Sequence, residues 1–493
     1  MPPTLRGARV HCLGIGGCGL SGLAQLIRAR GAIVSGSDMQ SSEVLDTLRH
    51  GGMDVREESP GTLPSDADLL VISAAVRENH PQVVEARSRS IPVRTYAQML
   101  GWCMRRSTGV AIAGTHGKST TSAMLGVALA HAGLDPTVIV GAQCRQLTEG
   151  VEHPTGGFCL GSDRIERGAR EGEPGVLIAE ACEFNRSFHN LCPTQASIAS
   201  IEADHLDIYG SLDAVVEAFG EFARLLPSAD RGGRLLIAHE GAHRREVTAG
   251  LECAIETVGF APGSDWRVRY DSASHRVGLS HDEIGELSWT MRQPGEHNAM
   301  NSAYAAAHAL RLGADASLVC ESLSDFKGVA RRTEFLGEHD GVRVYDDYGH
   351  HPTEIEATLR ALREHERPHE RGGRLICVFQ PHQHSRTRFL LDEFAQSFTQ
   401  ADVVIVPHIY FVRDSEAERT LVSASDLVDR LRERGVQAMH LYPFEAIIEQ
   451  LSQICREGDL VVVMGAGPVW QVAHGFMRNV PSPDGSSVGM VAS

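Results

Sequence analysis

The strongest chemical signal is a glycine loop at residues 114–120, which reads Gly-Thr-His-Gly-Lys-Ser-Thr. A strand-like apolar run ends at Ala113 and a helical pattern follows, so the loop is expected to open a helix. Unpaired amides at a helix N-terminus and the cation of Lys118 can hold phosphate groups, and Ser119 can coordinate Mg²⁺. The loop therefore predicts an ATP site. An ordinary strand–turn–helix connection is the alternative, because a full Walker A motif would have glycine in place of Ile112.

A second glycine turn lies near the N-terminus and reads Gly14-Ile15-Gly16-Gly17-Cys18-Gly19, which matches G-x-G-x-x-G. Asp38 follows nineteen residues after Gly19, as in a dinucleotide site. The turn physically requires only a diphosphate, so a UDP-sugar fits as well as NAD. Taken alone, the motif also leaves open an NAD-dependent dehydrogenase or a tight turn without a ligand.

Two further candidates each follow an apolar run. Glu180 comes directly after residues 176–179, and His205 comes shortly after residues 196–201. An α/β sheet places its ligands at the carboxyl ends of its strands, so both side chains are expected at strand ends.

Apolar strands, glycine turns and amphipathic helices alternate along the chain, which predicts an α/β fold with largely parallel sheets. Helical spacing is expected at 20–30, from the 114–120 loop to near Gly133, and at 298–310. Residues 150–175 are rich in Gly, Glu and Arg and predict a solvated loop. Strands are predicted at residues 8–13, 33–35 and 109–113, and buried strands at 342–345, 375–379, 403–406 and 460–464.

A chain of 493 residues is too long for one hydrophobic core, so several domains are expected. The pattern predicts three domains at 1–105, 106–326 and 327–480, and a disordered tail at 481–493.

The composition excludes some classes of function. A formal net charge of −17 argues against a nucleic-acid binder, because phosphate backbones require clustered Lys and Arg. The 11 cysteines are odd in number and contain no C-x-x-C pair, which indicates reduced thiols in the cytoplasm. No signal peptide precedes the first strand and no apolar run could span a bilayer, so no membrane partner is expected.

Together these features resemble the Mur ligase family, and are nearest to its alanine-adding member. The resemblance covers nearly the whole chain. It implies three α/β domains: a Rossmann-like N-terminal domain for a UDP-sugar, a central P-loop-type ATPase domain, and a Rossmann-like C-terminal domain for the amino acid. The matching motifs are His11–Ser21 with Gly36-Ser37-Asp38, Gly114–Thr120, Glu180-Ala181-Cys182-Glu183, Ile201-Glu202-Ala203-Asp204-His205, Gly295-Glu296-His297-Asn298, Arg331-Arg332, Asp346-Asp347-Tyr348-Gly349-His350-His351-Pro352 and Gln380-Pro381-His382.

The resemblance implies a role for each matching position. The catalytic residues would be Lys118, Glu180, His205 and Arg332. The ATP ligands would be Gly114, Thr115, His116, Gly117, Lys118, Ser119, Thr120, His297, Asn298, Asn301, Arg331 and Asp347. The UDP-sugar ligands would be Gly14, Gly16, Gly17, Gly19, Ser37 and Asp38, and the amino-acid ligands Tyr348, His350, His351, His382 and Arg386. Two Mg²⁺ ions would be held by Ser119, Glu180 and His205. From composition alone, Asn298 would be an N-cap.

The implied reaction joins UDP-N-acetylmuramate to L-alanine with ATP, through an acyl phosphate, in the synthesis of peptidoglycan precursors. The partners would be these small molecules, and the protein a monomer or a homodimer. The nearest alternative is a recycling ligase of the same family that adds a preformed tripeptide. A dehydrogenase would leave the 114–120 loop unexplained, and intact Lys118, Glu180 and His205 argue against a regulatory protein without ligase activity.

The chain departs from the family pattern after Gln380-Pro381-His382. The family continues Arg-Tyr-Thr/Ser-Arg, whereas this chain continues Gln383-His384-Ser385-Arg386. Arg386 can grip a carboxylate in a bidentate pair, but Gln383 brings no charge. We therefore expect a raised KM for L-alanine and detectable use of glycine or L-serine.

Overall fold

The computed structural model describes residues 5–57, 62–152, 154–168 and 170–478. The tail predicted at 481–493 lies outside these residues. The chain divides into two compact units: residues 1–293 with 297–329 form unit 1, and residues 294–296 with 330–493 form unit 2.

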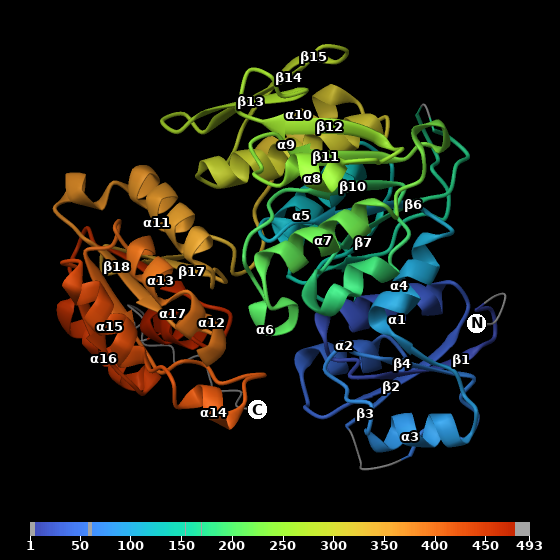
Figure 1. Ribbon diagram of the computed structural model, residues 1–493, viewed down its shortest axis with the longest axis horizontal. Helices are drawn as coiled ribbons and strands as arrows, with labels where there is room; N and C mark the ends of the chain where they lie inside the picture. Colours follow the sequence, from blue (N-terminus) through green and yellow to red (C-terminus); the bar gives the residue numbers. More distant parts are fainter. Residues whose placement is uncertain (1–4, 58–61, 153, 169, 479–493) are drawn as a thin grey trace. The chain divides into compact units, whose positions relative to one another are not determined.

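Unit 1 begins with a parallel five-stranded sheet of order β3-β2-β1-β4-β5 (Figure 1). Helix N-termini are capped by side chains: Ser42 accepts from the Leu45 amide, and Thr95 forms a capping box with Gln98. The strands are β1 (Arg9–Leu13), β2 (Ile33–Asp38), β3 (Asp54–Glu57), β4 (Leu69–Ile72) and β5 (Val93–Thr95). The helices are α1 (Cys18–Ala29), α2 (Glu43–His50), α3 (Pro81–Ser88) and α4 (Tyr96–Met104).

The second sheet of unit 1 has ten strands in the order β15-β14-β13-β12-β11-β10-β6-β9-β7-β8. Its central strands are parallel and fully buried, which explains why they read as continuous apolar runs. The strands are β6 (Thr108–Ala113), β7 (Thr137–Ile139), β8 (Phe158–Cys159), β9 (Val176–Glu180), β10 (Gln195–Ile198), β11 (Arg234–Ala238), β12 (Ala254–Gly259), β13 (Trp266–Asp271), β14 (Arg276–His281) and β15 (Gly285–Thr290). The helices are α5 (Lys118–His131), α6 (Leu206–Tyr209), α7 (Leu212–Ala223), α8 (Arg244–Thr248), α9 (Glu296–Arg311) and α10 (Ala316–Asp325), with 3₁₀ turns η1 (Arg145–Leu147), η2 (Phe184–Asn190) and η3 (Ala229–Arg231).

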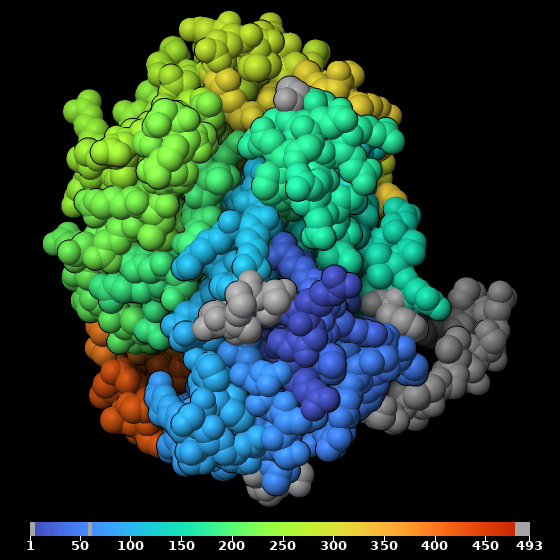
Figure 2. Space-filling model, turned by 90° about the vertical axis from the view of Figure 1, so that its right-hand side faces the viewer, coloured from blue at the N-terminus to red at the C-terminus, as the bar shows by residue number. Residues whose placement is uncertain are grey.

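The two sheets of unit 1 belong to one packed body. A single hydrophobic cluster runs from strands and helices of the first sheet into β9, β10 and α7 of the second. Arg30, the C-cap of α1, donates hydrogen bonds to Cys103 O of α4 (3.1 Å) and to Ser107 Oγ (3.0 Å), just before β6 of the second sheet. Figure 2 shows this side of unit 1, where blue N-terminal residues and cyan-to-green central residues form a continuous surface.

Unit 2 is built on a six-stranded sheet of order β16-β17-β21-β18-β19-β20, in which only β16 runs antiparallel to its neighbour. The strands are β16 (Glu334–His339), β17 (Val342–Asp347), β18 (Leu375–Phe379), β19 (Val403–Val406), β20 (Gln437–His440) and β21 (Leu460–Met464). The helices are α11 (Pro352–Glu366), α12 (His384–Phe389), α13 (Leu391–Ser397), α14 (Glu416–Arg419), α15 (Ala424–Glu433), α16 (Phe444–Ile454) and α17 (Trp470–Arg478), with η4 at Pro368–Arg371.

The α/β class and the predicted strands are confirmed, and three of the strands predicted as buried have the predicted bounds: 375–379, 403–406 and 460–464. The prediction of a solvated loop at 150–175 is partly wrong, because β8 pairs with β7 and Ile165 is buried. The sequence did not indicate this edge strand, because it has only two residues and lies in a segment rich in glycine and charged residues. Among the described residues, no helix has both the length and the apolar character needed to cross a membrane.

Candidate active site

The loop at 114–120 connects β6 to α5, as predicted. Gly114 has φ +134° and Gly117 has φ +80°, conformations that favour glycine. A side chain on Gly117 would also collide with Asn301, whose Oδ1 would lie 2.3 Å from an added Cβ. The glycines are therefore required by the backbone path that presents the amides of the first turn of α5.

Neighbouring segments hold this loop in place. The amide of Thr115 donates to Ser200 O (2.9 Å), and the amide of His116 donates to Ser200 Oγ (3.1 Å). Thr115 Oγ1 accepts from the Glu202 amide (2.9 Å). The loop is therefore tied to the segment that follows β10, which pairs directly with β6.

Lys118 turns its ammonium group back over the loop. Its Nζ donates to Gly114 O (2.7 Å) and Thr115 O (3.1 Å), and pairs with the carboxylate of Glu183 at 2.9 Å. Burial lowers the pKa of Lys118, but the negative charge of Glu183, with smaller effects of Cys182 and Glu180, more than offsets this and raises it. Lys118 is therefore a protonated cation beside the loop.

Glu180 is the last residue of β9 and is paired in register with Ile112 of β6, so it stands at the predicted strand end. Its Oε1 accepts from the amide of Gly141 at 2.9 Å. Three residues further on, Glu183 has a buried side chain.

His205 lies farther from its strand than predicted, and the prediction of a strand-end position is wrong. β10 ends at Ile198, and His205 is the N-cap of the short helix α6, with φ +53°. The apolar run to Ile201 suggested a longer strand, but the residues after Ile198 leave the sheet and hydrogen-bond to the 114–120 loop.

Three ligand groups converge beside His205. One ligand atom from each of Glu183, Asp204 and His205 lies within 4.8 Å of the other two, and Glu183 and Asp204 are buried. Glu183 and Asp204 were absent from the predicted site. Their positions within the motifs around Glu180 and His205 were the only signal in the sequence.

Asn301 lies against the 114–120 loop, where its Oδ1 accepts from Thr121 Oγ1 (3.2 Å) and its Nδ2 donates to Asn298 Oδ1 (3.4 Å). The N-cap interpretation of Asn298 is wrong, since α9 already begins at Glu296. Asn298, with His297, therefore lies within the first helical turn.

The N-terminal glycine turn borders a pocket of about 640 Å³ in unit 1. Gly14, Gly16, Gly17 and Asp38 of the predicted set line it. Asp38 Oδ2 accepts from the Gly16 amide (2.8 Å), so this carboxylate shapes the turn. The lining also includes residues that the sequence did not single out, among them Met39, Gln40, Ser42, Ser73, Arg77, Asn79 and His80.

Gly19 and Ser37 do not line this pocket. A Cβ on Gly19 would lie 2.8 Å from the ring of Tyr96, so Gly19 allows α1 to pack closely on α4. Ser37 is buried, accepts from Gln82 Nε2 (3.2 Å) and lies 3.3 Å from His11 Nε2. Burial lowers the pKa of His11 to about 4.

In unit 2, four of the five residues predicted to bind the amino acid come together. Aromatic contacts link Tyr348 to His350 (5.7 Å between centroids) and His350 to His382 (5.9 Å). Arg386 is buried, and its Nη1 lies 3.2 Å from His382 Nδ1. Tyr410, which the sequence did not indicate, extends the row, with its ring 5.7 Å from that of His382.

The fifth residue, His351, caps α11, where its Nδ1 accepts from the Thr353 amide at 3.3 Å. Asp347 is also engaged: it accepts from the amides of Thr333 (2.6 Å) and Gly349 (2.6 Å). Burial raises the pKa of Asp347, while Arg332 opposes the shift.

Gln383 and His384 mark the departure from the family pattern. Gln383 is 3% exposed and has φ +68°, and its amide donates to Tyr410 O at 3.1 Å. Asp414 caps α12 by accepting from the amides of His384 and Ser385 and from Ser385 Oγ. The segment is therefore buried next to the row of rings.

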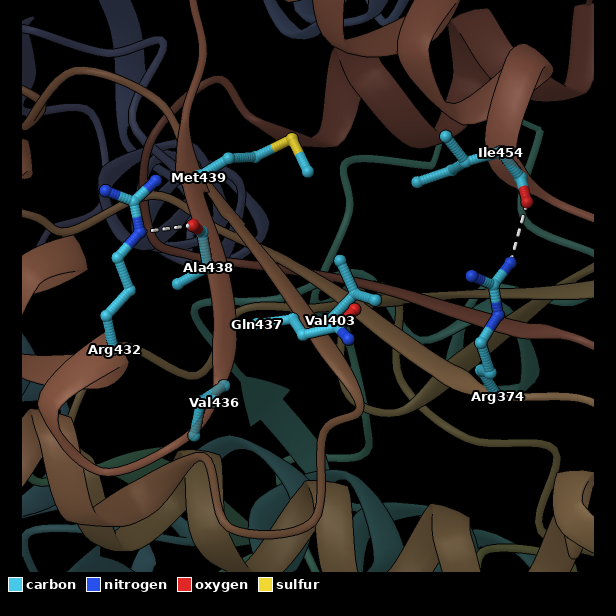
Figure 3. A pocket seen from close by; sticks show the side chains of 8 residues that line it. All are labelled: Arg374, Val403, Arg432, Val436, Gln437, Ala438, Met439 and Ile454. Carbon is cyan, nitrogen blue, oxygen red and sulfur yellow. Dashed lines mark hydrogen bonds between the residues drawn. The ribbon is translucent and has the colours of Figure 1, made fainter.

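Another pocket, of about 380 Å³, lies in unit 2 at the amino ends of β18, β19 and β20, and Figure 3 shows the side chains that line it. Its two arginines are used internally: Arg374 donates to Ile454 O (2.6 Å) and Arg432 donates to Ala438 O (2.9 Å). None of the predicted site residues lines it, and ligands of parallel sheets lie at the other, carboxyl edge. This pocket is therefore not the candidate site.

Comparison with known families gives three consecutive matches. Residues 9–108 match "Mur ligase family, catalytic domain", residues 112–309 match "Mur ligase middle domain", and residues 331–467 match "Mur ligase, glutamate ligase domain".

Individual relatives match over nearly the whole chain. The UDP-N-acetylmuramate–L-alanine ligase of Caldanaerobacter subterraneus is 36% identical, covering 95% of this chain and 97% of its own. That of Desulfitobacterium hafniense is 37% identical, covering 95% and 99%. The crystal structure of the corresponding ligase from Thermotoga maritima aligns with a TM-score of 0.75 at 25% identity, covering 95% and 98%. A murein peptide ligase from Psychrobacter arcticus shares the fold, with a TM-score of 0.69 at 24% identity over 96% and 99%.

Proposed function

Because this chain belongs to the Mur ligase family, we propose that it joins L-alanine to UDP-N-acetylmuramate, with ATP as the energy source, in peptidoglycan precursor synthesis. The observation that carries the assignment is full-length similarity: 36% identity to an L-alanine ligase over 95% of this chain. The phosphate loop with Lys118 above it supplies the ATP site that such a ligase requires.

Mg²⁺ is part of this proposal, and the side chains present fit it. Glu183, Asp204 and His205 converge within 4.8 Å, and carboxylate oxygens are the ligands that Mg²⁺ prefers. Ser119 and Glu180 are the further ligands that we propose, both at or beside the phosphate loop. Without a cation, these carboxylates would repel a nucleotide triphosphate, and bound Mg²⁺ supplies the positive charge that removes the repulsion.

The proposed chemistry has two steps. The lactyl carboxylate attacks the γ-phosphorus in line, which forms an acyl phosphate and releases ADP. The amine of L-alanine then attacks the acyl carbon, and phosphate leaves through a tetrahedral intermediate. Lys118 and the amides of the 114–120 loop stabilise the negative charge on the phosphoryl oxygens. Releasing Lys118 from Glu183 would accompany nucleotide binding, because both anions compete for one ammonium group.

The domain roles follow the predicted division. We propose residues 1–105 for the UDP-sugar, with the pocket of about 640 Å³ as its site, and residues 106–326 for ATP. Residues 327–480 would bind L-alanine through Tyr348, His350, His382 and Arg386, where the guanidinium meets the carboxylate. Since ATP is a cytoplasmic substrate, we place the reaction in the cytoplasm. The oligomeric state, monomer or homodimer, stays a prediction, which light scattering would test.

The deciding experiment measures phosphate release with ATP, Mg²⁺, UDP-N-acetylmuramate and one amino acid at a time. We expect release with L-alanine, and weaker release with glycine or L-serine. A preference for the preformed tripeptide would assign the chain to the recycling ligases instead. Nucleotide binding without any amino-acid-dependent release would contradict ligase activity.

A further inference from the structure

The continuous part of unit 2 begins at Ala330, and its first residues adopt a backbone conformation that needs support. Arg331 has φ +57° and Thr333 has φ +48°, in the left-handed region that residues with a Cβ rarely adopt. Their neighbours supply that support: Glu334 Oε2 accepts from the Arg331 amide (2.8 Å), and Tyr348 donates its amide to Arg331 O (2.7 Å). Asp347 accepts from Thr333. The segment is therefore held rigidly to β17.

The side chain of Arg331 completes this fastening. Its Nε donates to Asp346 Oδ2 (3.2 Å) on β17, and its Nη2 donates to Gly465 O (2.6 Å) and Gly467 O (3.4 Å) after β21. One guanidinium thus joins the start of unit 2 to the carboxyl ends of two neighbouring strands.

Arg332 is engaged differently. Its guanidinium lies 3.8 Å from Glu354 Oε1 and 5.0 Å from the centre of the Tyr348 ring. The guanidinium of Arg331 lies at the same distance from that ring, so both arginines contact Tyr348. Arg332 has one long ion pair, to the partly buried Glu354, whereas Arg331 donates to three acceptors, one of them the fully buried Asp346.

Loss of the Arg331 side chain would leave buried polar groups without a hydrogen-bond donor. Asp346 is fully buried, and its Oδ1 already has no hydrogen-bond partner among the described residues. Without Arg331, the carboxylate and the carbonyls of Gly465 and Gly467 would lose their donor. Breaking a buried ion pair by removing one partner is strongly destabilising.

We propose that Arg331 is a positioning residue and not an ATP ligand: with Asp346 it fastens the start of unit 2 to the Gly465–Gly467 turn, and so presents Arg332 and Tyr348 to the substrates. This inference rests on the proposed function, because only a ligase needs those two groups placed. It departs from the role that the family resemblance implies for Arg331.

The test separates positioning from ATP binding. Arg331→Gln and Asp346→Asn should each lower kcat by about 10-fold or more, while the Kd for ATP stays within about 2-fold of the native value. The double variant should be no slower than the slower single variant, because both substitutions disrupt the same pair between Arg331 and Asp346. A 10-fold weaker Kd for ATP in Arg331→Gln, with native kcat in Asp346→Asn, would overturn the proposal and make Arg331 a nucleotide ligand.

A pH profile adds a readout that general loss of structure would not produce. Burial raises the pKa of Asp346 to about 7; Arg331 opposes the shift, and Asp347 and Glu334 add to it. His474 of α17 interacts electrostatically with Glu334 and, more weakly, with Arg331. Below pH 7 Asp346 gains a proton and the pair with Arg331 weakens, so kcat of the native enzyme should fall there. In Asp346→Asn this acid limb should vanish, and its persistence would contradict the proposal.

Arg374, which directly precedes the amino end of β18, provides a matched control in the same unit; Figure 3 shows its hydrogen bond to Ile454. It also joins a buried aspartate, Asp459 (2.7 Å), to a backbone carbonyl, Ile454 O (2.6 Å). Arg374→Gln should lower the melting temperature but leave kcat of the folded enzyme unchanged. If it slowed turnover as much as Arg331→Gln, the effect would be general destabilisation and the positioning role would be rejected. Native turnover with L-alanine tests the proposed function separately.

Discussion

In the proposed reaction, Lys118 is the residue on which the chemistry most directly depends. Its ammonium lies over the phosphate loop and pairs with the buried carboxylate of Glu183 at 2.9 Å. Lys118→Ala should lower phosphate release by roughly 10²-fold or more, because one charge contact to the transferring phosphoryl group is lost. The assay is phosphate release by a variant whose circular dichroism matches the native protein.

Lys327 is the natural control for this experiment, since Lys118 and Lys327 are the two lysines of the chain. Lys327 is exposed and lies 3.9 Å from Glu149, so Lys327→Ala should keep native turnover. Near-normal phosphate release by a folded Lys118→Ala variant would show that another group carries the phosphoryl charge.

Gln383 tests the choice of amino acid. Gln383→Arg should lower the KM for L-alanine, because a second cation would join Arg386 near the carboxylate. Gln383 is 3% exposed, so the new charge should also lower the melting temperature until the amino acid binds. Steady-state kinetics with alanine, glycine and serine give the measurement. An unchanged KM would show that this side chain does not face the amino acid.

At the scale of elements, Glu183 and His205 are the N-caps of the turn η2 and the helix α6, and their side chains converge although they follow different strands. His205→Ala should raise the Mg²⁺ concentration needed for half-maximal turnover, and lower kcat more than it weakens ATP binding, because we place His205 on the metal and not on the nucleotide. Titrating Mg²⁺ at saturating ATP, with a separate nucleotide-binding measurement, checks this.

Glu183→Gln is the companion variant, since it keeps the shape of the side chain and removes its charge. The same shift in Mg²⁺ dependence is expected, and Lys118 loses its ion-pair partner. If ATP affinity collapsed in His205→Ala while turnover at saturating ATP stayed native, the metal assignment would be wrong.

For the molecule as a whole, buried histidines of unit 1 predict sensitivity to acid. His308 is fully buried, with Nδ1 3.2 Å from Gln195 Oε1, and burial lowers its pKa to about 3. The unfolded chain takes up this proton below about pH 6.5, whereas the folded chain does not. The contribution of His308 to the free energy of unfolding is therefore fully present above pH 6.5. It should fall by about 1.4 kcal/mol per pH unit as the pH decreases below that value.

Denaturant unfolding at pH 7, 6 and 5 measures this slope. His308→Gln should have a flatter dependence on pH than the native chain, even if its stability at pH 7 is lower. Equal slopes in both proteins would contradict the neutral buried histidine. The same comparison applies to His11, whose pKa burial lowers to about 4.

Local sequence was sufficient for the α/β class, the buried strands and the phosphate loop. Strands such as 375–379 and 460–464 are continuous apolar runs, because parallel strands are covered on both faces. The Gly114–Thr120 loop could be predicted from the sequence, because its conformation depends mainly on its own glycines and on the helix that it opens. The turn of Gly14, Gly16 and Gly17 could be predicted for the same reason.

Tertiary structure alone decided which side chains meet. Glu183 and Asp204 join His205 because β9 and β10 flank β6 in the sheet, and no local pattern encodes that order. The pocket lining from Ser73 to His80 and the place of Tyr410 beside His382 likewise depend on the packing of segments distant in sequence. Arg331 and Arg332 are adjacent and identical in type, yet only the first reaches the Gly465–Gly467 turn. Residue type and spacing determine which chemistry a segment can perform. Long-range packing determines which side chains from other segments lie beside it.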